Sequence, residues 1–252
     1  MTKIIAIANQ KGGVGKTTTA INLATAMVAI NKRVLIIDAD PQANASTGIG
    51  ILENNRQPCL YSMLTSGFFE SESIKKTLIP NLDIITSTND LAAAELELAN
   101  EKNRENRLKN ILIKIQGYDY FFIDCPPALG LLTINSLVVA NSVIVPLQCE
   151  FFALEGLNAL TKTIQFIKNN FNNNLEIEGV VLTMYDKRNS LSHLVENDVR
   201  EFFGEKVYKT LIPRNVRISE APSHGKPVLI YDTTCVGSKA YIELAKEVIL
   251  NQ

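Results

Sequence analysis

KGGVGKTT, from Lys11 to Thr18, is the stretch that decides the fold of this chain of 252 residues. An apolar run at residues 4–8 precedes it and an apolar helical pattern follows, so the order is strand, glycine-rich turn and helix. Glycines adopt backbone angles that a Cβ forbids, and their amides and the helix N-terminus attract phosphate. The sequence therefore predicts a P-loop, in which Lys16 neutralises the β- and γ-phosphates, Thr17 ligates Mg²⁺ and Thr18 donates to a phosphate oxygen.

This loop departs from the common pattern G-x-x-x-x-G-K-[ST], because Gln10 stands where the first glycine belongs and a second lysine, Lys11, follows it. In isolation, Lys11 would be a solvated loop charge. The whole string resembles the deviant Walker A motif of the ParA/MinD family of ATPases, which implies ATP and Mg²⁺ as cofactors. In that family the extra lysine reaches across a nucleotide-sandwich dimer to the partner's ATP, as an arginine finger does in trans. Gly12 has no side chain, which suits close approach of a second subunit.

The resemblance assigns roles to the residues of the loop. Lys11 and Lys16 become catalytic residues, and Thr17 becomes a metal ligand. The implied nucleotide-binding set is Lys11, Gly12, Gly13, Val14, Gly15, Lys16, Thr17 and Thr18.

Aspartates follow two predicted strands, where carboxylates face the ligand crevice of an open α/β sheet. Asp38 and Asp40 lie in D-A-D-P-Q after the strand at residues 33–38, and either alone would often be a turn cap. The string matches the family's switch I, which implies that Asp40 places the attacking water and that Asp38 supports the magnesium shell. Ala43 stands where relatives often carry glycine, and we expect this to change loop freedom slightly without loss of chemistry.

Asp124 ends the strongly apolar strand at residues 118–123, which is the Walker B arrangement. Its carboxylate is expected to reach Mg²⁺, usually through a water. The D-C-P-P string resembles the family's switch II, whose two prolines give a stiff loop that can transmit a change at the γ-phosphate. Cys125 is expected to be a packing residue, since nothing basic adjoins it in sequence.

Strands alternate with helices along the rest of the chain, which predicts a doubly wound, mostly parallel α/β sheet flanked by helices, in a single domain over residues 1–252. We expect one long helix over residues 91–115, with a possible break near 100–106, and a last strand over 207–212. The predicted strands cover residues 3–9, 33–38, 82–86, 118–123, 142–146, 177–184 and 207–212. The predicted helices cover residues 17–31, 91–115, 131–140, 154–170, 191–203 and 237–250.

A second signature, P-R-N-V-R-I-S-E-A-P-S-H-G-K-P at residues 213–227, reads as a loop with a possible helix start near Ser219. By resemblance it narrows the family to the ParA/Soj-type partition ATPases. Pro213 and Asn215 would then flank and hydrogen-bond the adenine, and Met184 would pack against the base. As isolated residues, Pro213 and Asn215 would be turn formers.

Basic residues outnumber acidic ones by five to one between Lys206 and Lys226, in a chain of net charge −1. Such a run is often only a solvated face. The resemblance makes Arg188, Arg217 and Lys226 candidate phosphate contacts on non-specific double-stranded DNA, whose binding should weaken steeply with salt. It also implies an ATP-dependent homodimer, a ParB-type centromere-binding partner that stimulates hydrolysis, and a cytoplasmic, nucleoid-associated protein.

Composition bounds the other function classes. With 46% hydrophobic residues, a packed core is expected, and no apolar run approaches the roughly 18–20 residues of a membrane span. The short N-terminal apolar run leads directly into the P-loop, so we expect a strand and no signal peptide. The four cysteines form no C-x-x-C pair, which favours reduced thiols over a zinc or redox motif.

Three alternatives share the P-loop. A MinD-type membrane ATPase is disfavoured because the C-terminal helix has a polar face balanced in charge, where a membrane-surface helix would be basic. A metallocluster carrier of the nitrogenase iron protein type would need cysteines that bridge a dimer, and Cys125 and Cys149 lack that context. A metabolic amidase-ligase or synthetase would need substrate residues that the sequence does not reveal.

Overall fold

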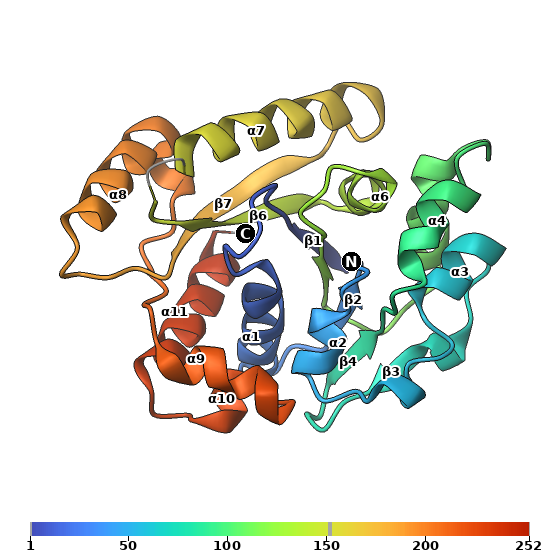
Figure 1. Cartoon of the computed structure of the whole chain (residues 1–252), viewed down its shortest axis with the longest axis horizontal. Helices are drawn as coiled ribbons and strands as arrows, with labels where there is room; N and C mark the ends of the chain where they lie inside the picture. Colours follow the sequence, from blue (N-terminus) through green and yellow to red (C-terminus); the bar gives the residue numbers. More distant parts are fainter. Residues whose placement is uncertain (1, 151–152, 252) are drawn as a thin grey trace.

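The computed structural model describes residues 2–150 and 153–251. Its centre is a seven-stranded sheet of order β3-β4-β2-β5-β1-β6-β7 (Figure 1), in which β3 is antiparallel to β4 and the other neighbouring strands are parallel. The strands are β1 Lys3–Ile7, β2 Val34–Asp38, β3 Ile74–Lys76, β4 Leu82–Ile85, β5 Tyr120–Asp124, β6 Ser142–Gln148 and β7 Glu176–Thr183.

Helices cover both faces of the sheet (Figure 1), as expected for parallel strands that are mostly apolar. Along β1 the side chains alternate between the two cores, with Ala6 in one and Ile5 and Ile7 in the other. This confirms the predicted doubly wound α/β fold. One core includes residues of α3 Leu60–Ser66, α4 Leu91–Glu97, α5 Arg107–Leu112, α6 Leu131–Val139, α7 Ala153–Asn170 and α8 Ser190–Phe203. The other includes residues of α1 Lys16–Ala29, α2 Asn44–Gly48, α10 Val228–Tyr231 and α11 Val236–Leu250.

The order of the strands brings the predicted site together. β5 lies between β1 and β2, and Asp124 pairs in register with Ile7 on one side and with Asp38 on the other. The P-loop starts directly after β1, so this loop and both carboxylates meet at one edge of the sheet. That edge is where open α/β sheets bind ligands.

The prediction of a strand at residues 207–212 is wrong, because this segment does not form a regular ladder of paired residues. This segment runs beside β7, but only isolated bridges form, Val180 with Val207 and Tyr185 with Pro213. The carboxylate of Glu247 on α11 instead accepts the backbone amides of Lys209 and Thr210. These two amides are therefore not available for a ladder with β7, although the amides of Tyr208 and Ile212 still donate to carbonyls of that strand.

The predicted helix at 91–115 is interrupted, as the possible break near 100–106 anticipated. It becomes α4, a turn in which Asn103 has a φ of 58°, the 3₁₀ segment Arg104–Asn106, and α5. The short edge strand β3 and the short helices α2, α3 and α10 were not predicted. The helix expected to start near Ser219 begins earlier, as α9 Val216–Glu220.

Candidate nucleotide and magnesium site

The P-loop has the backbone geometry that phosphate binding needs. Gly13 and Gly15 have φ values of 75° and 89°, in the left-handed region that favours glycine. Gly15 stands at the N-cap of α1, so the first amides of this helix face the crevice. Lys16 is buried, and its ammonium group donates to the carbonyl of Lys11 at 3.0 Å. Burial lowers the pKa of Lys16, and Asp124, Cys125 and Asp40 oppose that shift.

Two adjoining cavities lie along this loop, and both are lined by Gly15, Thr18 and Met184. The phosphate-side cavity, of about 320 Å³, is also lined by Gly12, Gly13, Lys16, Thr17 and Asp40. The base-side cavity, of about 210 Å³, is also lined by Pro213, Asn215, Ile218 and Tyr241. The structure thus makes neighbours of the predicted adenine residues and most of the predicted phosphate residues, although about 200 residues separate them in the chain. Lys11 and Val14 line neither of these two cavities.

Met184 stands where the two cavities meet. Its φ is 51°, a left-handed conformation that is rare for a residue with a long side chain. Strained backbone of this kind collects at ligand sites, where the surrounding structure holds it in place. The geometry therefore agrees with the predicted contact between Met184 and a bound base.

Asp124 has the environment of a metal ligand. It is fully buried, and among the described residues neither carboxylate oxygen has a partner at good hydrogen-bond geometry, although the Thr17 hydroxyl is close enough to affect it. Burial raises its pKa well above the ordinary value, Asp38 adds to the shift, and the Thr17 hydroxyl opposes it. Orphaned carboxylate oxygens near a threonine hydroxyl fit Mg²⁺, which takes one or two protein oxygens and completes its shell with phosphates and water. That mode agrees with the described residues, where no cluster of three or more acidic, histidine or cysteine ligands occurs.

Asp38 differs from Asp124 because its oxygens are already engaged. One oxygen accepts the Ser46 amide at 2.8 Å and the Ser46 hydroxyl at 2.7 Å, and the other faces the Asp40 amide at 3.4 Å. Burial is the main cause that raises the pKa of Asp38, to about 6. Asp38 therefore fastens α2 to the end of β2, and its predicted support of the magnesium shell stays a prediction.

Asp40 lines the phosphate-side cavity, where a water attacking the γ-phosphate would stand. Its carboxylate accepts the amide of Gln42 at 2.9 Å, which fixes the turn that carries it. Ala43 follows with a φ of 53°, so the position where relatives often carry glycine does have left-handed backbone.

Lys11 is half-buried, and its ammonium group is paired with Glu150, just beyond β6. Its amide donates to the Asn9 side chain at 3.0 Å, and Asn9 in turn donates to the carbonyl of Pro146 on β6. Sequence reasoning did not single out Glu150 or Asn9, because their connection to the loop exists only in the folded sheet. Beside them Gly12 is exposed, and a Cβ added there would meet no atom of the other described residues within 4 Å, its two chain neighbours aside.

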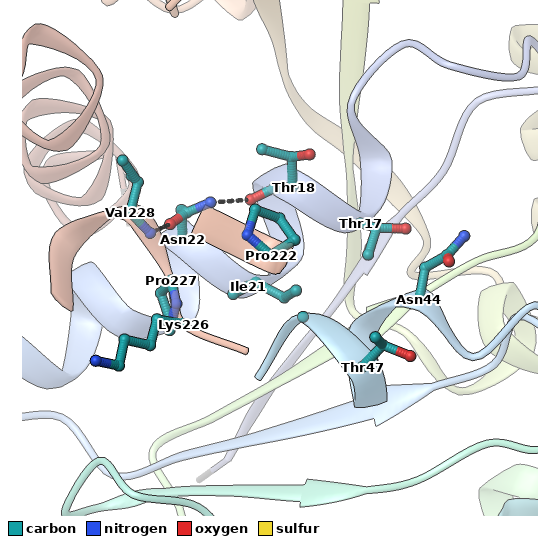
Figure 2. A pocket seen from close by; sticks show the side chains of 11 residues that line it. Thr17, Thr18, Ile21, Asn22, Asn44, Thr47, Pro222, Lys226, Pro227 and Val228 are labelled. Carbon is teal, nitrogen blue, oxygen red and sulfur yellow. Dashed lines mark hydrogen bonds between the residues drawn. The ribbon is translucent and has the colours of Figure 1, made fainter. Parts of the chain in front are cut away.

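The three predicted DNA contacts lie apart in different surroundings. Arg188 makes a two-pronged ion pair with Asp186, and Arg217 pairs with Glu220 at 3.0 Å and Asp232 at 3.5 Å. Lys226 is exposed and lines a separate cavity of about 270 Å³ between α1, α2 and the segment 222–228 (Figure 2). Each candidate reaches solvent, but the two arginines already have carboxylate partners.

A wide groove surrounds Arg188 and adds basic residues that the predicted set did not include. It has a volume of about 680 Å³ and contains four basic side chains and two acidic ones. Arg214 and Lys187 could have been suspected, since they adjoin predicted residues in the sequence. Lys239 could not, because only the packing of α11 brings it here. These side chains are Lys187, Arg188, Arg214 and Lys239, with Asp186 and Glu243.

The cysteines described by the structure are free, and burial is the main cause that raises the pKa of Cys125 and of Cys149, each to about 12. Both are buried, which does not suit a cluster shared between two subunits. The packing role predicted for Cys125 is consistent with these facts. None of the described helices is both long enough and apolar enough to cross a membrane.

Comparison with known proteins agrees with this geometry. A family described as an AAA domain matches residues 2–177. The chain is 56% identical to the chromosome partitioning protein ParA of Caulobacter vibrioides, over 98% of this chain and 94% of that one. It is 52% identical to the sporulation initiation inhibitor protein Soj of Bacillus subtilis, over the whole of both chains.

A crystal structure of cobyrinic acid a,c-diamide synthase from Mycobacterium smegmatis, with bound ADP and magnesium, superposes with a TM-score of 0.86. The two proteins are 33% identical, over 99% of this chain and 94% of that one. The P-loop, the paired aspartates and the relatives that match the chain end to end lead to one assignment: the chain belongs to the ParA/Soj family of chromosome-partitioning ATPases.

Proposed function

We propose that the chain binds MgATP with its triphosphate in the phosphate-side cavity and its adenine in the base-side cavity. Lys16 and the amides of residues 12–18 hold the phosphates, and Pro213, Asn215 and Met184 contact the base. Thr17 and Asp124 hold Mg²⁺, which supplies charge neutralisation on the phosphate oxygens. Asp40 orients the attacking water, and Asp38 keeps the Asp40 turn and α2 in place.

We further propose that ATP joins two copies face to face, so that Lys11 of each contacts the nucleotide of the other. The open surface at Gly12 carries this proposal. Among the described residues, Gly12 and its two chain neighbours aside, no atom lies within 4 Å of a Cβ built there, and the ammonium group of the neighbouring Lys11 is paired with Glu150. Packing inside the described monomer therefore does not require a glycine here, whereas a closely approaching phosphate or second subunit does.

The dimer is proposed to bind double-stranded DNA without sequence preference. Arg188, Arg217 and Lys226 are the proposed contacts, and Arg214 and Lys239 join Arg188 through the groove that they line. Release of counterions from the DNA backbone would supply the affinity. A ParB-type partner would stimulate hydrolysis and return the protein to monomers, so ATP turnover would time a cycle on the nucleoid, within the cytoplasm.

The alternatives have less support. The apolar side of α11, with Tyr241, Leu244 and Val248, is buried in the core, so this face is already occupied and does not favour a membrane-surface role of the MinD type. The diamide synthase shares the fold at 33% identity, whereas the partition proteins are 52% and 56% identical over nearly the whole chain. The higher identity favours partition over an amide-forming reaction.

Retention on DNA, measured with ATP, with ADP and without nucleotide, tests the proposal. Wild type should be retained only with ATP, and retention should fall steeply as salt rises. Asp40→Ala should stay bound because it cannot hydrolyse ATP. Gly12→Val should bind nucleotide but remain monomeric and unretained. Equal retention of wild type in all three nucleotide states would overturn the proposal.

A further inference from the structure

The phosphate-side and base-side cavities are built from parts of the chain that no short loop connects. The cradle belongs to residues 12–18, whereas most walls of the base-side cavity belong to residues 212–222. The spacing between them must therefore be set by tertiary contacts. Two buried side chains, Thr183 and Asn22, make these contacts as hydrogen-bonded bridges.

Thr183 forms the first bridge. Its hydroxyl donates to the carbonyl of Val14 at 2.8 Å, and both residues are buried. Tyr185, just after the end of β7, is bonded to the segment that lines the base-side cavity. Its amide donates to the carbonyl of Ile212 at 3.0 Å, and its carbonyl accepts the amide of Arg214 at 3.1 Å. Thr183 thereby joins the P-loop backbone to the segment that carries Pro213 and Asn215.

Asn22 on α1 forms the second bridge, and Figure 2 shows its two hydrogen bonds. Its amide nitrogen donates to the carbonyl of Thr18 at 2.8 Å, and its oxygen accepts the amide of Val228 at 2.7 Å. Val228 is fully buried and opens α10, directly after the segment of the second signature. A buried amide at the start of a helix needs an acceptor, and Asn22 supplies one from 206 residues away.

We propose that Thr183 and Asn22 are positioning residues that hold the phosphate cradle and the base-side cavity at the spacing of a nucleoside triphosphate. They add affinity for ATP beyond that for its phosphates alone. Asn22 acts from outside both cavities, and Thr183 acts from the wall of the base-side cavity through the bond of its hydroxyl to Val14. This inference rests on the proposed place of adenine near Pro213 and Asn215. Neither residue belongs to the set that the P-loop or the second signature identifies.

Binding of MgATP and of magnesium tripolyphosphate, compared by calorimetry, separates the two cavities, since tripolyphosphate occupies the cradle alone. The variants are Thr183→Val, which removes the hydroxyl at constant shape, and Asn22→Leu, which removes both bonds. Thr25→Val is the matched control, because its hydroxyl also donates to a buried carbonyl at 2.8 Å, but within α1. Asn22→Asp keeps an acceptor for Val228.

Thr183→Val and Asn22→Leu should each weaken MgATP by about two- to tenfold, the range for one hydrogen bond, and change tripolyphosphate binding less than about twofold. In steady-state hydrolysis KM for ATP should rise while kcat stays near the wild-type value. Asn22→Asp should recover most of the MgATP affinity. Thr25→Val should change neither ligand's affinity.

Proportional losses for both ligands, or none for either, would overturn the inference, as would equal losses in Asn22→Asp and Asn22→Leu. Failure of the underlying site is a different result. If wild type binds MgATP no more tightly than tripolyphosphate, then the base-side cavity does not hold adenine at all.

Discussion

The ammonium group of Lys11 is paired with the carboxylate of Glu150 in the same chain. The proposed dimer requires this ammonium group at the partner's nucleotide instead, so the ion pair opposes dimerisation. The two side chains are 37% and 44% exposed, and pairs of that exposure contribute roughly 0.2–1 kcal/mol.

Glu150→Gln should therefore shift ATP-dependent dimerisation toward the dimer, by at most about fivefold for each ion pair and about 25-fold for the two pairs that a symmetric dimer breaks, the upper range for exposed pairs. Analytical ultracentrifugation with ATP on the Asp40→Ala background measures this without turnover. Glu176→Gln, which breaks the exposed pair with Lys168, is the control. A weaker dimer in Glu150→Gln would mean that this carboxylate helps the assembled state and does not compete with it.

Asp124→Asn should stabilise the nucleotide-free protein at neutral pH. Burial and Asp38 raise the pKa of this carboxyl well above its ordinary value, and a neutral amide does not carry the cost of ionisation in that position. We expect a gain of roughly 1–3 kcal/mol in the free energy of unfolding at neutral pH, the desolvation cost of such a group. The same change should abolish magnesium-dependent ATP hydrolysis. Urea unfolding and a turnover assay together check both effects, and a loss of stability would contradict the account of this carboxylate.

Asp38 should make stability depend on pH. Its folded pKa of about 6 lies above the unfolded value of about 3.9, so its contribution is fully present below pH 4 and is lost as pH rises through 6. The total change is on the order of 3 kcal/mol at most. In urea unfolding without nucleotide or Mg²⁺, the free energy of unfolding of Asp38→Asn should rise relative to that of wild type as pH increases from about 4 to 6.5. A difference in free energy of unfolding between the two proteins that stays constant across that range would contradict the raised pKa of Asp38.

Ala43→Gly should stabilise the protein by up to about 1 kcal/mol. The substitution relieves the strain of alanine at a φ of 53°, and the larger loss of backbone entropy when glycine folds offsets part of that gain. The hydrolysis rate should not change, since Ala43 is buried and does not line the phosphate-side cavity. Thermal unfolding and steady-state kinetics check the two parts separately. A destabilised Ala43→Gly protein would show that the buried methyl outweighs the backbone strain.

Much of the fold could be predicted from local sequence patterns. The loop 11–18 and the apolar strands that end in Asp38 and Asp124 were predicted because their signals are local: glycine, lysine and carboxylate stand beside runs that can only be buried. The strand prediction for residues 207–212 was wrong because the conformation of this segment depends on Glu247, nearly 40 residues later. The carboxylate of Glu247 accepts hydrogen bonds from two of its amides. The edge strand β3 was missed because three residues, two of them lysines, carry no strand pattern.

The candidate site divides in the same way. The phosphate residues and the two key aspartates follow from motifs, and Pro213 and Asn215 from a resemblance that the base-side cavity is consistent with. Glu150, Thr183 and Asn22 could not have been predicted, because each acts through a partner 139–206 residues away. Nothing near them in sequence distinguishes a buried bridge from an ordinary polar residue.

The most direct test of the central claim mixes two inactive variants. The Lys11→Ala variant keeps Asp40 but lacks the lysine that would contact its partner's nucleotide. The Asp40→Ala variant keeps Lys11 but cannot hydrolyse its own ATP. If Lys11 acts on the partner's nucleotide, an equal mixture should recover about a quarter of wild-type ATPase activity, since half of the dimers are mixed and each has one complete site. A mixture no more active than the two variants measured separately would show that Lys11 does not act in trans.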